Sequence, residues 1–375
     1  MKKNILLAAL LSTLMLIWGC TKNENEILIG EYGSLTGSDA TFGLSTNKGV
    51  RMAFDEINDK GGIKGKKLKL LTLDNQGKNE ESAAVVTRLI TQSNVIAVIG
   101  EVASSRTKAA APIAQKYKIP MISPSSTNPE VTKIGDYIFR VCFIDPFQGL
   151  VMAKFATENL KLKKVAILRD VKSDYSVGLA DVFAAEIKKM GGEVVADLSY
   201  QAGDIDFKAQ LTQIRSKNPE AVFIPGYYTE VGLIAQQSRQ LGIKVPLLGG
   251  DGWDSSKLNE IGKEAINGSY FSNHYTTEST DPVVTEFIKK FKAKYNETPD
   301  GLAALGYDSA KILAAAIERA SELTSEKIRD EIAKTKEFPG VTGKITINEN
   351  RDAVKSAVVV QVMNADRKYI TTVNP

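Results

Sequence analysis

Residues 94–127 read NVIAVIGEVASSRTKAAAPIAQKYKIPMISPSST, two short apolar runs on either side of a helical pattern. The first run, 95–99, is rich in β-branched residues and too short for a helix, so it predicts a buried parallel strand. Ser104 or Ser105 is placed to cap a helix, and Pro120 ends that helix before a second apolar strand. The stretch therefore predicts a strand, a helix and a parallel strand in one unit.

The loop SPSST, 123–127, closes this unit at the carboxyl end of its second strand. In such a unit both strand ends and the helix N-terminus meet at one edge of the sheet. Free N–H groups, the positive end of the helix dipole and several hydroxyls then face the same space. We expect this edge to bind a carboxylate or another small anion. The same serines and threonine also suit plain caps and turns, which is the alternative interpretation.

Strand and helix patterns keep alternating along the chain, which predicts parallel sheets covered by helices on both faces. At 375 residues the chain is long enough for two domains. The segment 111–127 is echoed by 235–253, since each has a helical pattern, a proline, an apolar strand and a polar loop. We therefore expect an α/β fold of two doubly wound parallel-sheet lobes, with an antiparallel hairpin at 356–373.

Composition and charge narrow the function classes. The chain is 43% hydrophobic and 25% charged, and 48 basic against 44 acidic residues leave a formal charge of only +4. That balance does not favour a nucleic-acid partner. His274 is the one histidine, and the glycine loops and nucleophile elbow of common enzyme families are absent. We expect no cofactor, no metal and no enzyme activity, with an exported enzyme using a carboxylate pair as the weaker alternative.

The N-terminus has the pattern of an export signal. Lys2 and Lys3 precede an apolar segment, 5–18, that is shorter than the ~20 residues a membrane-spanning helix needs. The segment ends at Trp18-Gly19-Cys20 and turns polar, which resembles the lipobox of bacterial lipoproteins, although Trp18 is bulky for that pattern. We expect a signal peptide at 1–20, lipid on Cys20 and a tether at 21–26. A plain secretory signal or an uncleaved anchor is the alternative.

Six segments together resemble the leucine/isoleucine/valine-type periplasmic binding proteins of ABC importers. They are GSLTG, FDEINDKGGIKGKKLKL, IGEVASS, PMISPSST, SDYSVGLA and PGYYTEVG, and the similarity runs from Ile27 to about Met363. The resemblance implies the type I periplasmic-binding fold, two lobes joined by three crossovers, near Arg140, near Asn273 and at 344–348. One lobe would hold 27–140 and 274–343, and the other 141–273 and 344–375.

The resemblance also assigns polar site residues. Ser104 matches the serine whose hydroxyl binds the ligand carboxylate, Ser125 a backbone contact and Thr127 a hydroxyl contact. Asp251, in GGDGW, occupies the acidic position that pairs with the ligand ammonium, where glutamate is common in the family. Without the resemblance, an aspartate among glycines is typical of a turn.

Four further side chains match positions that surround the ligand: Tyr175, Tyr227, Phe42 and Leu302. Tyr228, next to Tyr227, leaves a one-residue ambiguity in the aromatic assignment. Trp253 lies near enough in sequence to narrow the pocket, and core packing is an alternative role for Leu302. Cys142 is expected to be a small core residue.

The resulting hypothesis is an exported, lipid-anchored monomer that captures an amino acid, apolar or branched, and delivers it to an ABC permease complex in the membrane. One alternative is a protein of the same fold that binds another solute, such as an amide, a short peptide or an aromatic acid. A second alternative is a sensory ligand-binding domain that feeds a signalling protein. The sequence shows no C-terminal transmembrane segment or output domain, which we count against this alternative.

Overall fold

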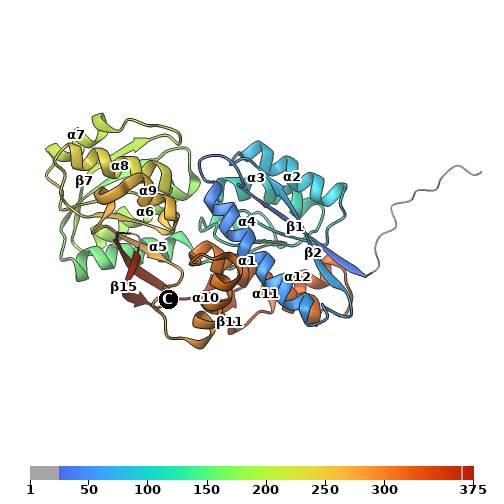
Figure 1. The fold of residues 1–375 in the computed structure, drawn as a ribbon. Helices are drawn as coiled ribbons and strands as arrows, with labels where there is room; N and C mark the ends of the chain where they lie inside the picture. Colours follow the sequence, from blue (N-terminus) through green and yellow to red (C-terminus); the bar gives the residue numbers. More distant parts are fainter. Residues whose placement is uncertain (1–24, 365) are drawn as a thin grey trace, which may run out of the picture.

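The structure is a computed structural model that describes residues 25–364 and 366–375. The signal peptide, Cys20 and all but the last two residues of the tether predicted from the sequence lie outside this range. Figure 1 shows two α/β bodies side by side, each built around its own sheet. We call them the five-strand unit and the seven-strand unit.

The five-strand unit contains a wholly parallel sheet in the order β2-β1-β3-β4-β5. Its strands are β1 (Glu26–Gly33), β2 (Lys67–Asp74), β3 (Ala97–Ile99), β4 (Met121–Ser123) and β5 (Ile138–Arg140). Its helices are α1 (Ala40–Asp59), α2 (Asn79–Thr91), α3 (Ser104–Lys116), α4 (Glu130–Lys133), α10 (Pro282–Tyr295), α11 (Gly301–Arg319) and α12 (Ser325–Ala333).

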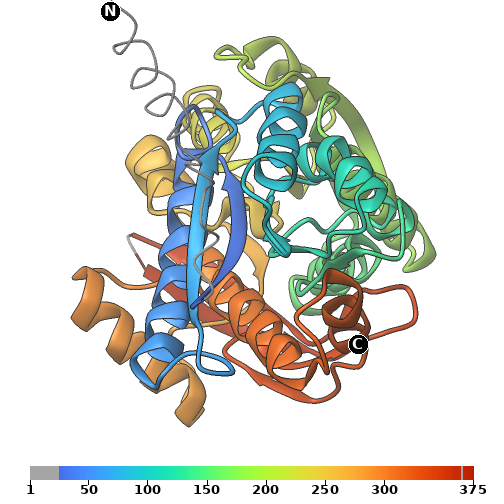
Figure 2. The same cartoon turned by 90° about the vertical axis from the view of Figure 1, so that its right-hand side faces the viewer.

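Both faces of this sheet are covered by helices. Neighbouring residues of a strand point to opposite faces, so each strand contributes side chains to both packed layers. In β3, Val98 packs with residues of α2 and α3, whereas Ala97 and Ile99 pack with the cluster that contains α1 and α11. Figures 1 and 2 show α1 alongside α11, and the two helices are in contact. Continuous apolar runs such as 95–99 are therefore central strands, as the sequence predicts.

The seven-strand unit has the order β15-β14-β10-β9-β8-β6-β7. Its strands are β6 (Lys164–Asp170), β7 (Glu193–Tyr200), β8 (Ala221–Phe223), β9 (Leu247–Gly249), β10 (Tyr270–Asn273), β14 (Ala357–Met363) and β15 (Asp366–Val373). Its helices are α5 (Asp145–Lys154), a π-helical turn (Phe155–Asn159), α6 (Asp174–Lys189), α7 (Lys208–Ser216), α8 (Tyr228–Gln240), a short turn (Asp251–Trp253), α9 (Ser256–Gly262) and a second short turn (Lys263–Ile266).

The two sheets repeat one arrangement. The order β7-β6-β8-β9-β10 matches β2-β1-β3-β4-β5, and β14 and β15 extend the second sheet as an antiparallel hairpin. This confirms the α/β fold class, the hairpin and the similarly built halves that the internal echo predicts. The loop after β9, which holds Asp251, is therefore equivalent to the SPSST loop after β4.

A small third sheet was not expected from the sequence. It consists of β11 (Phe338–Gly340), β12 (Gly343–Ile347) and β13 (Ala353–Val354), paired antiparallel. Asp352 joins it to the five-strand unit, because its Oδ1 lies 2.7 Å from Arg140 Nε and accepts from Thr132 Oγ1 at 2.9 Å. The segment 338–354, which holds the small sheet, therefore contacts the five-strand unit.

The helix cap predicted at Ser104 or Ser105 is wrong. Helix α3 begins at Ser104 with Ala103 in the N-cap position, and no side chain caps it. Both hydroxyls are instead used as acceptors, Ser104 Oγ from the Asn128 N–H at 3.2 Å and Ser105 Oγ from the Asp174 N–H at 2.9 Å. These longer-range bonds compete successfully with the local cap.

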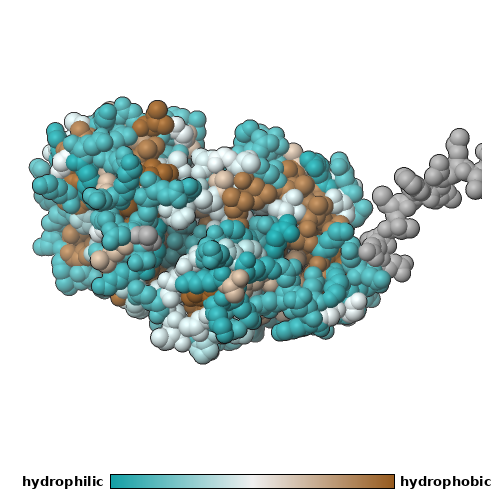
Figure 3. Space-filling view, viewed as in Figure 1, coloured by the Kyte–Doolittle hydropathy of each residue, from teal (hydrophilic) through white to brown (hydrophobic). Residues whose placement is uncertain are grey.

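Among the described residues, no helix combines the length and apolar character that a membrane crossing requires. Cys142 is fully buried, as predicted. On the face shown in Figure 3, hydrophilic residues cover most of both units, and the surface is hollowed where the units meet.

Candidate functional site

A small cavity lies between the two units, at the carboxyl ends of their sheets. It is lined by Phe42, Val102, Ser104, Ser125, Tyr175, Tyr227, Asp251, Gly252 and Leu302. All the site residues predicted from the sequence except Thr127 are among them.

The five-strand unit supplies a donor-rich wall. Because β3 and β4 are parallel neighbours, the start of α3 and the loop after β4 meet at one edge, which brings Ser104 and Ser125 together. The Ser104 hydroxyl accepts from Asn128 and so keeps its proton for a donor bond to a ligand. The first N–H groups of α3 have no carbonyl partner earlier in the helix, and the helix dipole favours an anion there.

Thr127 does not line the cavity. Its side chain is fully buried, and its backbone oxygen accepts from the Asp145 N–H at 2.9 Å. Burial raises the pKa of the Asp145 carboxyl well above its ordinary value, and the neighbouring Thr127 hydroxyl offsets this in part. The structure therefore places Thr127 behind the cavity wall, beside a buried acid that sequence reasoning did not identify.

The seven-strand unit supplies one carboxylate. Asp251 is only 6% exposed, and its Oδ1 accepts from Gln148 Nε2 at 2.8 Å. Its Oδ2 accepts from Ser125 Oγ at 3.1 Å and lies 3.0 Å from His274 Nε2. Ser125 comes from the five-strand unit, so this bond crosses the gap between the units. Ionised carboxylates accept up to about four hydrogen bonds, so Asp251 has room for one more donor in the cavity.

Gln148 and His274 were not identified from the sequence. Gln148 lies on α5 and His274 follows β10, so neither is near Asp251 along the chain. Burial lowers the pKa of the His274 imidazole. The adjacent Asp251 carboxylate acts in the opposite direction and reduces this shift. The only available signal was that His274 is the one histidine, and that signal is also typical of a structural role.

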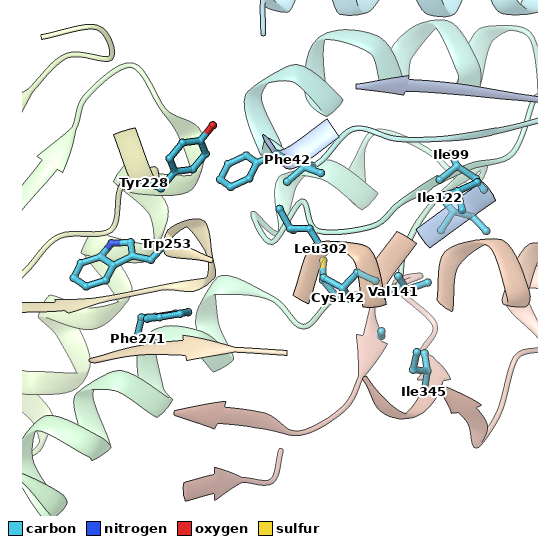
Figure 4. Close-up of a cluster of buried hydrophobic side chains, with 14 of the residues drawn as sticks. Phe42, Ile99, Ile122, Val141, Cys142, Tyr228, Trp253, Phe271, Leu302 and Ile345 are labelled. Atoms are coloured by element: carbon cyan, nitrogen blue, oxygen red, sulfur yellow. The ribbon is translucent and has the colours of Figure 1, made fainter. Parts of the chain in front are cut away.

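Aromatic rings form the rest of the wall. Tyr175 and Tyr227 stack in parallel with centroids 5.5 Å apart and an angle of 6° between the rings. Phe42 meets Tyr227 edge-on at 5.3 Å. Tyr228 instead donates its hydroxyl to the Ser38 carbonyl at 2.7 Å, so Tyr227 is the residue that faces the cavity. In Figure 4, Phe42 lies between Leu302 and Tyr228, at the junction of the units.

Gly252 and Val102 are lining residues that the sequence did not suggest. A Cβ at position 252 would lie 2.8 Å from the Gly226 oxygen and 2.9 Å from Tyr227 Cδ1, so the close packing of this loop requires glycine. Trp253, expected near the pocket, is not a lining residue. Its Nε1 donates to the Ile224 carbonyl at 2.9 Å, and Figure 4 shows it set back in the seven-strand unit.

Further polar contacts join the two units. Thr41 and Ser255 hydroxyls are 2.9 Å apart, and Lys108 Nζ lies 2.9 Å from Asp174 Oδ1. With the Ser125–Asp251 bond, they hold the two walls against each other. The arrangement is a closed one, in which the cavity is largely cut off from water.

Comparison with known proteins gives consistent matches. The sequence model of a family described as periplasmic binding protein matches residues 26–368. The Leu/Ile/Val-binding protein BraC3 of Rhizobium johnstonii is 32% identical over 329 residues, 87% of this chain and 89% of its own length. An amino acid binding protein of Pseudomonas aeruginosa is 33% identical over 92% of both chains.

Two solved structures are similar over nearly their whole length. The leucine binding protein LivK from Thermotoga maritima has 43% identity and a TM-score of 0.90, covering 93% of this chain and 99% of its own. LivJ from Streptococcus pneumoniae, a branched-chain amino acid transporter substrate binding protein in complex with isoleucine, has 39% identity and a TM-score of 0.89, covering 93% and 100%.

Proposed function

This chain belongs to the periplasmic binding protein family, and we propose that it captures an apolar, branched-chain amino acid between its two units. The observation that carries the proposal is that Ser104 and Asp251 line one small cavity from opposite units. A zwitterion has the matching pair of charges, an anion for the donor-rich wall and a cation for the acid. The names of the relatives, which refer to leucine, isoleucine and valine, support the same ligand class.

Each part of the ligand has a counterpart. The carboxylate would lie at the start of α3 and accept from the Ser104 hydroxyl and backbone N–H groups. The ammonium would donate to Asp251, because a buried cation without a paired charge costs several kcal/mol. The side chain would pack against Phe42, Val102, Leu302 and the two stacked tyrosines, which give the cavity its apolar surface.

The two units would act as lobes that close on the ligand. We assign 27–140 and 274–343 to one lobe and 141–273 to the other, as the sequence suggests. Because β12 pairs with both β11 and β13, we place the third crossover at 355–356, after the position expected from the sequence. Closure excludes water and strengthens the polar contacts, so the ligand stabilises the closed form. A membrane permease can then distinguish the loaded protein from the empty one.

The family consists of substrate-binding proteins of transporters, located outside the cytoplasm, rather than of enzymes. We assign this chain to delivery of its ligand to an ABC importer as a monomer. Lipid on Cys20 would hold it at the membrane, and Cys20→Ala should move the protein from the membrane fraction to the soluble fraction. Unchanged membrane association would contradict the anchor and leave the ligand proposal intact.

A thermal-shift screen of the twenty amino acids against protein that lacks residues 1–20 tests the ligand class. A ligand at about a hundredfold excess over Kd stabilises the folded form by ~2.7 kcal/mol. Leucine, isoleucine or valine should raise Tm, and charged amino acids should not. A shift with charged amino acids alone, or with none, would contradict the proposal.

A further inference from the structure

The one histidine of the chain lies directly behind the acid of the cavity. The His274 side chain is 1% exposed, and its Nε2 is 3.0 Å from Asp251 Oδ2. The ring also stacks on Phe143, with centroids 3.9 Å apart and an angle of 21°. Besides Asp251, the charged groups Lys355 and Asp254 act electrostatically on the ring. His274 does not line the cavity, so any effect on a ligand passes through Asp251.

Chemistry fixes which nitrogen carries the proton. A carboxylate oxygen only accepts, so Nε2 is the protonated nitrogen and donates to Asp251. In the neutral ring Nδ1 is then an acceptor, and it has no hydrogen-bond partner among the described residues. A buried acceptor without a partner is unfavourable. Stacking on Phe143 alone would be served better by phenylalanine, which has no polar atoms.

Gln148 and His274 together hold both oxygens of the acid. Gln148 binds Oδ1 from α5, and His274 binds Oδ2 from the position that directly follows β10 of the seven-strand unit, at the proposed crossover between the lobes. They can therefore fix the plane of the carboxylate before the units close. Ser125 reaches Oδ2 only from the other unit, so its contribution depends on closure.

From this geometry we infer that His274 is a positioning residue for the ligand ammonium, acting through the carboxylate of Asp251. The inference rests on the proposed function and deepens it, because it assigns part of the selectivity for amino acids to a residue outside the cavity.

Leucine affinity of three variants, measured by calorimetry, tests the inference. His274→Phe keeps a stacking ring and removes the donor, so leucine should bind about 10- to 100-fold more weakly, the range for a hydrogen bond to a charged group. His274→Gln restores an N–H donor and should recover most of the affinity. Phe207→Leu, a buried aromatic change at the far edge of the same unit, should lower Tm and leave affinity unchanged.

A second ligand separates positioning from general damage. 4-Methylpentanoate has the carbon skeleton and carboxylate of leucine but no ammonium. If His274 acts through the ammonium, His274→Phe should weaken leucine binding and leave 4-methylpentanoate binding unchanged. An equal loss for both ligands, wild-type leucine affinity in His274→Phe, or no recovery in His274→Gln would overturn the inference.

Nitrogen-15 NMR of labelled histidine gives a direct signature, since only one imidazole is present. The spectrum should show a protonated Nε2 and a bare Nδ1, and leucine should shift the Nε2–H signal as Asp251 shares its charge with the ammonium. A neutral ring protonated at Nδ1 instead of Nε2 would overturn this inference and leave the proposed function intact. If the wild-type protein binds no amino acid, the proposed function fails and the inference fails with it.

Discussion

The loops after β3 and β4 and the loops after β8 and β9 occupy equivalent places in two sheets of the same strand order, yet they offer opposite chemistry to one cavity. The first pair presents the start of a helix, with Ser104 and backbone N–H groups. The second pair presents a single carboxylate, Asp251, held by side chains from three other segments. The anion end of the proposed ligand would share its charge among several donors, whereas the ammonium would depend on one acid.

This difference has a physical consequence for mutation. Backbone N–H donors are kept in every substitution except one to proline, so the wall at α3 should tolerate the loss of a hydroxyl. The Asp251 carboxylate has no backbone group that could replace it, so removing it would leave the ligand ammonium unpaired. The following predictions test that asymmetry in order of expected effect.

Asp251→Ala should have the largest effect. An unpaired buried ammonium costs about 3–5 kcal/mol, which lowers leucine affinity by about 150- to 5,000-fold. Calorimetric titration measures the change. Asp197→Ala, an exposed acid of the same unit that pairs with Arg169, is the matched control and should bind leucine as the wild type does. Retained affinity in Asp251→Ala would place the ammonium elsewhere.

Ser104→Ala should have an intermediate effect, because it removes one charge-assisted hydrogen bond while the N–H groups of α3 remain. The expected loss is about 1–3 kcal/mol of binding free energy. Ser105→Ala is the neighbouring comparison, since it removes no cavity-lining hydroxyl and shows the cost of losing one contact between the units, the bond from the Asp174 N–H to Ser105 Oγ. If both variants bind leucine equally well, the carboxylate is not held at this helix start.

The buried Asp145 predicts a pH effect on stability at the acid end of the cavity. Its pKa is raised by burial, so the folded protein holds this proton more tightly than the unfolded chain does. That stabilisation is complete below the ordinary carboxyl pKa and is lost as pH rises through the raised value. Asp145→Asn cannot ionise, so between about pH 5 and pH 8 its unfolding free energy should fall less than that of the wild type.

Urea unfolding of both proteins at the two pH values measures this difference. Parallel changes in the two proteins would show that Asp145 is ionised in the folded state. Leucine affinity of Asp145→Asn at neutral pH should stay close to that of the wild type, since the residue does not line the cavity.

Ser125→Ala should have the smallest effect. Its hydroxyl donates to Asp251 across the gap, but the ligand ammonium is a stronger donor to the same carboxylate, and the contact predicted for Ser125 is through its backbone. Leucine affinity should change by less than about 1 kcal/mol. A loss as large as that of Ser104→Ala would mean that the ammonium end also depends on a hydroxyl from the other unit.

The two walls also differ in how far they could be predicted from the sequence. Ser104 and the SPSST loop follow from a local strand, helix and strand pattern, because the geometry of that unit is set within about thirty residues. Asp251 and the tyrosines required the family resemblance, since turn residues and core aromatics look alike in a single sequence. The resemblance placed Thr127 in the wall, whereas the structure buries Thr127 outside the cavity lining.

Gln148 and His274 could not be found in this way. They reach Asp251 from α5 and from the end of β10, and only the folded sheet brings these segments together. The small sheet of β11 to β13 was missed for a similar reason, because its strands are too short to give a clear alternation. Ala103 replaced the serines as the α3 cap because both hydroxyls found partners outside the helix.

The central claim is that the two walls hold the two charged ends of one molecule, and truncated ligands test it most directly. Calorimetric titration of the wild-type protein should compare leucine with 4-methylpentanoate, which lacks the ammonium, and 3-methylbutylamine, which lacks the carboxylate. We predict that leucine binds at least about 100-fold more tightly than either, since each analogue leaves one wall without its partner. An analogue that binds as tightly as leucine would contradict the account.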